Sequence, residues 1–113
     1  MIRKRLRWDR IFESKEDLQM LLGSNSSLVH KTFFGEYLFI QLENEVRAYS
    51  SICPHQKKKM NGAWVDGDSV VCPVHQYHYK LENGRGHGMC LEPFPLKFEE
   101  DGVYIGREKW SLF

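Results

Sequence analysis

Two short cysteine–histidine pairs constrain the fold of this chain more than any other feature. The pairs are Cys53-Pro54-His55 and Cys72-Pro73-Val74-His75, and 16 residues separate His55 from Cys72. Each pair offers one thiol and one imidazole, which is too few donors to complete a tetrahedral metal site alone. We therefore expect the two segments to meet in space, so that all four side chains serve one site.

Two kinds of metal centre use this donor set. One is a [2Fe-2S] centre with two Cys on one iron and two His on the other, and the second is a structural zinc site. Zinc fingers usually pair like with like, whereas each pair here mixes a Cys with a His. The pattern favours the iron–sulfur centre, with zinc as the alternative. Neutral imidazoles in place of two thiolates make the centre easier to reduce. The reduction potential of such a centre is roughly −150 to +300 mV, against about −400 mV for plant-type ferredoxins with four thiolates.

Length and composition narrow the class of protein. A chain of 113 residues suits one domain. Sixteen Lys and Arg against fifteen Asp and Glu give no global support for a nucleic-acid partner, although residues 2–10 are locally basic. Three cysteines, two of them beside histidines, indicate metal binding in a reducing compartment, so we expect a cytoplasmic protein. No run approaches the roughly 20 apolar residues of a membrane-spanning helix.

One segment has the pattern of a helix. Ser14 with Asp17 three residues later suggests a capping box, an apolar face of leucines lies within 18–22, and Gly23 follows as a C-terminal cap. These signals predict a helix of about 8 residues.

The rest of the chain has the pattern of short strands separated by turns. Gly35-Glu36 is expected to be a two-residue hairpin turn, and Asn83-Gly84 and Asp101-Gly102 are further turn signals. Repeated short strands predict a small all-β domain. The expected strands are 28–34, 37–42, 46–52, 69–71, 77–81 and 103–105.

The two motifs resemble those of the Rieske iron–sulfur family, and of the small Rieske-type ferredoxins in particular. The resemblance implies an all-β fold of antiparallel sheets with two cluster-binding loops and one short N-terminal helix. It also implies a single domain over 1–113, with base strands at about 1–49 and 93–113 and a cluster-binding lobe at about 50–92.

Ligand roles follow from the same resemblance. In the family the Cys ligands bind the inner iron and the His ligands bind the outer, exposed iron. Cys53 and Cys72 would then hold the inner iron, and His55 and His75 the outer one. The respiratory branch carries a disulfide at the positions occupied here by Lys58 and Val74, so the resemblance points to the ferredoxin and oxygenase type.

Four further residues are expected around the cluster. Tyr79 matches a tyrosine that donates a hydrogen bond to the first ligand Cys in the high-potential branch; the alternative is a packed strand aromatic with its hydroxyl in water. Gln76 stands where the family usually has Gly, and Tyr77 replaces a serine of that branch. Pro93 begins a segment that resembles the cover over the cluster. We expect the Tyr79 hydroxyl to raise the reduction potential.

A basic run follows the first motif. Lys57, Lys58 and Lys59 could steer an acidic redox partner to the exposed histidines, and the alternative is an ordinary solvated loop. The third cysteine, Cys90, has no partner at a recognised metal-binding spacing, and we expect it to be a buried thiol.

The resemblance implies a one-electron carrier. It would be a monomer that passes electrons from a reductase to an oxygenase or a similar acceptor, without nucleic-acid or membrane partners. It would not itself be an enzyme, because a Rieske oxygenase subunit needs a second domain with mononuclear iron, and no such domain is evident after Cys90. Two alternatives are the small Rieske-like subunit of an assimilatory nitrite reductase and a cluster-based redox sensor.

Overall fold

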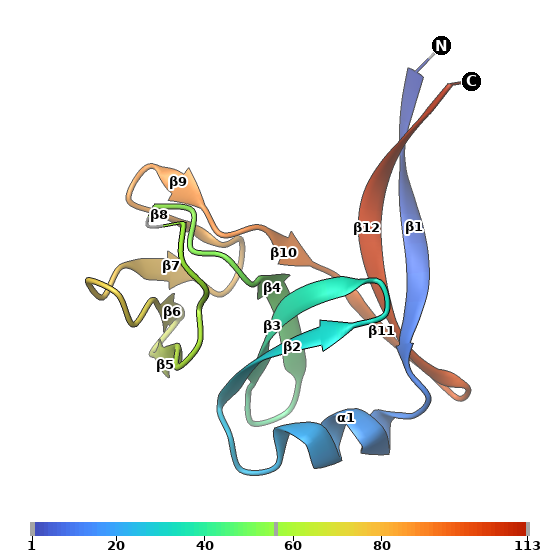
Figure 1. Cartoon of the computed structure of the whole chain (residues 1–113), viewed down its shortest axis with the longest axis horizontal. Helices are drawn as coiled ribbons and strands as arrows, with labels where there is room; N and C mark the ends of the chain where they lie inside the picture. The colour runs from blue at the N-terminus through green and yellow to red at the C-terminus, as the bar shows by residue number, and fades with distance from the viewer. Residues whose placement is uncertain (1, 56, 113) are drawn as a thin grey trace.

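The computed structural model describes residues 2–55 and 57–112, with the side chains of residues 5–55 and 57–108. Over these ranges the chain forms one helix and a series of antiparallel strands, which confirms the expected all-β class (Figure 1). The elements are α1 (Lys15–Leu22), β1 (Ile2–Phe12), β2 (Ser27–Thr32), β3 (Gly35–Gln41), β4 (Val46–Ser50), β5 (Trp64–Asp66), β6 (Ser69–Val71), β7 (His78–Lys80), β8 (Arg85–Gly86), β9 (Met89–Cys90), β10 (Pro93–Phe94), β11 (Leu96–Glu99) and β12 (Gly102–Leu112).

The helix has the expected ends. The Ser14 side chain accepts a hydrogen bond from the Asp17 amide at 3.1 Å, which satisfies one of the otherwise unpaired donors of the first turn. Gly23 ends the helix at φ 55°, a backbone conformation that glycine adopts without a steric penalty. Leu18 and Leu22 are both fully buried and anchor the helix. Within the described residues, no helix is long and apolar enough to cross a membrane.

The strands of the described residues form four sheets. The central sheet has the strand order β10-β4-β3-β2, and a second sheet has the order β1-β12-β11. Two small sheets, β5-β6-β7 and β8-β9, form a lobe on one side, while β1 and β12 lie on the other side (Figure 1). The strands of this lobe run from Trp64 to Cys90, and the expected bounds of about 50–92 stay a prediction.

Strand β3 separates two hydrophobic cores. Because side chains alternate along a strand, Leu38 and Ile40 enter one core and Tyr37 and Phe39 enter the other. We call the first the lobe core; its buried members are Leu38, Ile40, Tyr49, Cys53, Met60, Ala63, Val70, Cys72, Tyr79 and Leu91. We call the second the base core; its buried members are Leu18, Leu22, Tyr37, Phe39, Ala48, Val103 and Ile105.

The first hairpin turns two residues earlier than expected. Strand β2 ends at Thr32, which pairs with Gly35, so the turn is Phe33-Phe34 and the expectation of Gly35-Glu36 was wrong. The Thr32 hydroxyl explains the early end, because it donates to the Gly35 carbonyl at 2.7 Å and accepts from the Phe34 amide at 3.1 Å. A side chain that bonds to nearby backbone in this way favours a turn over a continued strand.

The longest pairing was not anticipated. Strand β1 pairs with β12 from Ile2↔Leu112 to Phe12↔Val103, so the expected strand 103–105 is only the start of an 11-residue element. Strand β1, the N-terminal partner of this pair, contains the locally basic segment of the sequence. Its strand conformation depends on a partner at the other end of the chain, which no local pattern reveals.

Candidate metal centre

Two loops carry the four candidate ligands. The first, residues 53–58, follows strand β4, and the second, residues 72–77, joins β6 to β7. Each loop is closed by the same backbone bond: the Cys53 amide donates to the Lys58 carbonyl at 2.8 Å, and the Cys72 amide donates to the Tyr77 carbonyl at 2.8 Å. We call these the ligand loops. Their common closure gives each cysteine a fixed backbone position.

The two thiols lie together in the lobe core. Cys53 and Cys72 are both fully buried. Burial, together with a smaller effect of the neighbouring Cys53 thiol, raises the pKa of the Cys72 thiol to about 11. A thiolate at neutral pH therefore needs a compensating positive charge here, and a bound metal supplies one.

Tyr79 occupies the position expected of a donor to the first cysteine. Its hydroxyl lies 3.3 Å from Cys53 Sγ, and its side chain is fully buried. Burial raises the pKa of Tyr79, and contact with Cys53 raises it further, so the hydroxyl keeps its proton. The alternative of a hydroxyl in water was wrong. The geometry allows Tyr79 to donate a hydrogen bond to the sulfur.

The two imidazoles lie at the exposed tips of the loops. His55 and His75 are exposed, and both lie against the ring of Tyr77, with centroid distances of 4.2 and 6.4 Å. His87, which the sequence did not mark as part of the site, contacts the same ring at 4.7 Å. Its Nε2 accepts a hydrogen bond from the His78 amide at 3.1 Å, which fixes the imidazole orientation.

The donors are arranged in two like pairs. The thiols are buried side by side, and the imidazoles share the Tyr77 ring near the surface. Within the described part of the chain, no three or more His, Cys, Asp or Glu side chains surround a single point, as one zinc ion would require. A two-iron cluster takes its thiolates and imidazoles on different irons. The donor arrangement therefore fits a [2Fe-2S] centre.

Both loops contain non-glycine residues in the left-handed backbone region. Lys57 has φ 57° and Gln76 has φ 56°, and Gln76 stands where the resembling family usually has Gly. Such a conformation costs on the order of 1 kcal/mol or more in a residue with a Cβ. The ligand loops thus keep the glycine-type backbone without the glycines. His75 shares this conformation, with φ 64°.

The remaining expectations have mixed outcomes. Lys57, Lys58 and Lys59 are exposed, but Lys59 Nζ forms an ion pair with Glu36 at 3.1 Å, and this hydrogen bond lowers the pKa of Glu36. The expectation that Cys90 is buried was wrong. It lies in the exposed two-residue strand β9, and its thiol donates to the Asn83 carbonyl at 3.4 Å.

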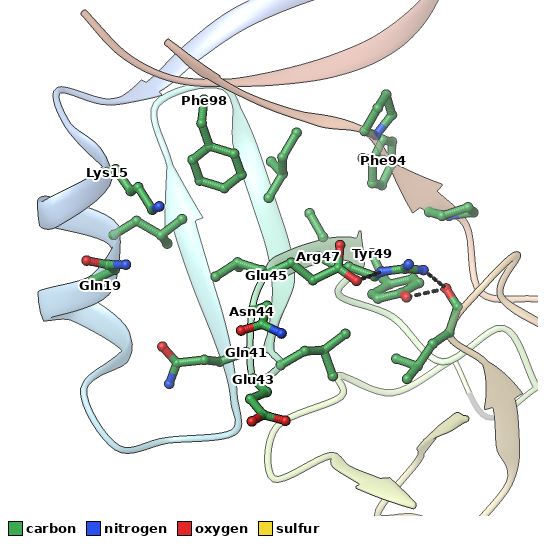
Figure 2. A pocket seen from close by; sticks show the side chains of 18 of the residues that line it. Lys15, Gln19, Gln41, Glu43, Asn44, Glu45, Arg47, Tyr49, Phe94 and Phe98 are labelled. Atoms are coloured by element: carbon green, nitrogen blue, oxygen red, sulfur yellow. Dashed lines mark hydrogen bonds and ion pairs between the residues drawn. The ribbon is translucent and has the colours of Figure 1, made fainter. Parts of the chain in front are cut away.

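The proline-containing segment has a clear place in the base. Pro93 pairs with Tyr49 of β4, and Phe94 packs edge-on against Tyr37 with ring centroids 5.2 Å apart. Both residues line a groove of about 850 Å³ between α1, β4 and β11, shown in Figure 2. Its lining includes none of the four candidate ligands. A covering role for Pro93 over the cluster stays a prediction.

Comparison with known families gives a match over most of the chain. A model of the Rieske [2Fe-2S] domain matches residues 14–94. The ferredoxin component of the alkene monooxygenase system of Xanthobacter autotrophicus is 36% identical over 77 residues, which is 65% of this chain and 63% of that protein. The match thus spans less than two thirds of that relative. The ferredoxin component of the naphthalene 1,2-dioxygenase system of Pseudomonas putida is 25% identical over 76 residues, 62% of this chain and 71% of that protein.

Solved structures share the fold at low sequence identity. The ferredoxin of carbazole 1,9a-dioxygenase from Nocardioides aromaticivorans matches with a TM-score of 0.66 at 12% identity, over 87% of this chain and 95% of that one. A protein described as the small subunit of an NADH-dependent nitrite reductase from Mycobacterium tuberculosis matches with a TM-score of 0.64 at 13% identity, over 93% and 96%. At this identity the likeness establishes the fold alone.

Proposed function

Because this chain belongs to the Rieske [2Fe-2S] domain family, we propose that it carries single electrons to an oxygenase on a cluster held by its two ligand loops. One observation carries the assignment of ligands. The two cysteines are buried together beside the Tyr79 hydroxyl, while the two exposed histidines share the half-buried ring of Tyr77. When bound, a Rieske-type cluster accepts and releases one electron at a time.

The chain supplies an inner and an outer environment for the cluster. The lobe core excludes water from the thiol side, and Tyr79 donates a hydrogen bond toward Cys53 Sγ. Such a donor favours the more negative, reduced state and raises the potential. On the outer side His55 and His75 are exposed, so a partner can approach within contact of the imidazole edge.

The carrier role follows from this arrangement and from the similarity to ferredoxin components of oxygenase systems. We assign the chain the role of an electron-transfer component, taking electrons from a reductase. We place it in the cytoplasm as a monomer, where the three described thiols stay reduced. A cluster-based sensor stays an untested alternative.

Spectroscopy on protein purified without air tests the ligand assignment. A red-brown protein with one [2Fe-2S] per chain and a Rieske-type EPR signal after reduction is expected. Replacing His55 or His75 with Ala should abolish that signal. The control is His78→Ala, at an exposed histidine of β7, which should leave the signal intact. A colourless protein with stoichiometric zinc would contradict the proposal.

The lysines of the first ligand loop offer a test of docking. Reversing Lys57 and Lys58 to Glu should slow electron transfer to an oxygenase several-fold at low salt, with the difference shrinking as salt screens the charges. Lys80→Glu, at an exposed site on β7, is the charge-matched control. Equal rates for all variants would remove the docking role. If the protein transfers electrons to no oxygenase and instead assembles into a nitrite reductase, the result would favour the alternative of a nitrite reductase subunit.

A further inference from the structure

The ribbon formed by β1 and β12 is an unprotected sheet edge. Strand β1 is 11 residues long and pairs with β12 on one side only; its other edge has no strand partner among the described residues. Strand β11 supports β12 only through its residues 102–105, so the outer part of the ribbon is two-stranded. Figure 1 shows this part extending away from the body of the molecule. Open edges of this length usually invite pairing with another chain.

The basic charge of the chain is concentrated on this edge. Strand β1 contains five Lys or Arg and one Asp, although the whole chain has a net charge of only +1. Arg5 and Arg7 are exposed. Pairing β1 with β1 of a second copy would bring like charges together, which is unfavourable. An acidic strand would instead place opposite charges across from each other.

Side chains along β1 alternate in character as well as in direction. Arg5 and Arg7 lie on one face of the ribbon, and Leu6 and Trp8 lie on the other with 45% and 36% of their surface exposed. A matching strand would therefore alternate acidic and apolar residues. Nucleic acid and lipid surfaces can neutralise arginines, but they do not offer the alternating backbone donors and acceptors that a free strand edge requires.

An exposed aromatic residue is fixed beside the ribbon. Phe33, at the β2–β3 turn, is 95% exposed. Arg107 of β12 ties this turn to the ribbon: it donates to the Phe34 carbonyl at 3.0 Å and pairs with Asp9 of β1 at 2.8 Å. The Asp9 side chain is only 4% exposed and also pairs with Arg7 at 3.0 Å. This network holds the turn in place next to the basic face.

We propose that an extended, acidic segment of a partner protein adds to β1 as a further strand, with Phe33 as an apolar contact beside it. The inference goes beyond the carrier function and does not depend on the cluster. The ribbon and the lobe lie on different sides of the molecule, so the ligand loops stay open while the edge is occupied (Figure 1). Strand addition of this kind takes affinity from backbone bonds and specificity from alternate side chains.

A labelled peptide tests the proposal directly. The probe is a ten-residue peptide of alternating Glu and Val with a fluorescent label, titrated by anisotropy with the full chain at low salt. We expect Arg5→Glu to weaken binding by about tenfold, because one strand-facing charge is reversed. Lys80→Glu, the same charge change on β7, should leave affinity unchanged. Phe33→Ser should weaken binding by a few-fold without loss of folding, since the side chain is exposed.

Backbone chemistry separates strand addition from simple charge attraction. Two N-methylated peptides are needed, one methylated at the odd positions and one at the even positions. Alternate N–H groups point to the same edge of a strand, so only one of the two peptides should lose binding. Equal affinity of the unmodified peptide and both methylated forms would overturn the proposal, as would equal affinity of a Lys-for-Glu peptide. Binding to phosphatidylserine vesicles or duplex DNA that is lost in Arg5→Glu, without peptide binding, would also overturn it. So would a dimer in sedimentation that dissociates in Arg5→Glu.

Discussion

The base core and the lobe core share the central sheet but are built from different material. The base core is closed by the leucines of α1 and by the 11-residue strands β1 and β12. Away from the central sheet, the lobe core is closed by strands of two or three residues, and its buried members include two thiols and two phenols. Such short strands provide few ladder bonds, so the lobe depends on its loops and on what they bind.

The difference suggests that the base and the lobe are stabilised by different interactions. The base core is almost entirely apolar and contains none of the candidate ligands, so apolar burial is its main source of stability. The lobe instead holds two unfavourable features, a buried Cys72 thiol with a pKa of about 11 and a strained backbone at Gln76. We expect the two regions to respond differently to the same kind of change.

The largest effect should follow loss of a thiol ligand. Cys53→Ser or Cys72→Ser should abolish the visible absorbance of the cluster and open the lobe to amide hydrogen exchange, while β1, β12 and α1 stay protected. Cys90→Ser, at the exposed thiol, should change neither. A lobe that stays as protected as the base without its cluster would break the comparison.

Truncation of a side chain in the base core should lower the stability of the protein without affecting the cluster. Leu18→Ala removes a fully buried side chain and should lower the free energy of unfolding by about 2–5 kcal/mol. The cluster potential should not move, because this side chain belongs to the base core. Met20→Ala on the same helix, at a side chain that is 80% exposed, is the control and should have little effect. Urea unfolding and a redox titration measure the two quantities.

Removing single hydroxyls compares two tyrosines of the lobe core, one that contacts Cys53 and one that bonds to the backbone instead. Tyr79→Phe should lower the midpoint potential by tens of millivolts, because the donor to Cys53 Sγ is lost. Tyr49→Phe removes a hydroxyl that donates to the Leu81 carbonyl at 2.5 Å; it should cost about 1 kcal/mol of stability and leave the potential unchanged. An unchanged potential in Tyr79→Phe would remove that residue from the tuning of the cluster.

The smallest effect should be a gain. Gln76→Gly and Lys57→Gly relieve left-handed backbone at non-glycine residues and should each stabilise the holo-protein by about 1 kcal/mol. Lys58→Gly, next to a strained residue but itself at negative φ, should instead lose stability, because the unfolded chain gains freedom. Thermal unfolding of the three variants in parallel provides the measurement. Equal shifts would mean that the loops store no strain.

The sequence predicted what depends on near neighbours. The ends of α1 follow from Ser14, Asp17 and Gly23, and the structure has them where expected. The contact between Tyr79 and Cys53 could also be anticipated, but only through the family resemblance, because 25 residues separate the two in the chain.

Features that depend on distant pairing could not be anticipated. Strand β1 has a basic sequence in which only a short alternation, Arg5 to Trp8, resembles a strand, and its full length depends on pairing with β12. His87 reaches the site because its Gly-rich loop folds back toward β7. There the His87 imidazole accepts a hydrogen bond from the His78 amide. Cys90 has a residue type that is often buried, yet its short strand lies on the surface.

The identical closure of the two ligand loops has a consequence for how such chains can vary. Each cysteine amide bonds to the carbonyl five residues further on, at Lys58 and at Tyr77. Both bonds join backbone atoms and form here although Lys57 and Gln76 adopt a glycine-type conformation, so we expect most substitutions inside the loops to leave them in place. An insertion or deletion of one residue would instead move an imidazole relative to its cysteine. Loop length, more than loop composition, is therefore the property that a functional variant has to keep.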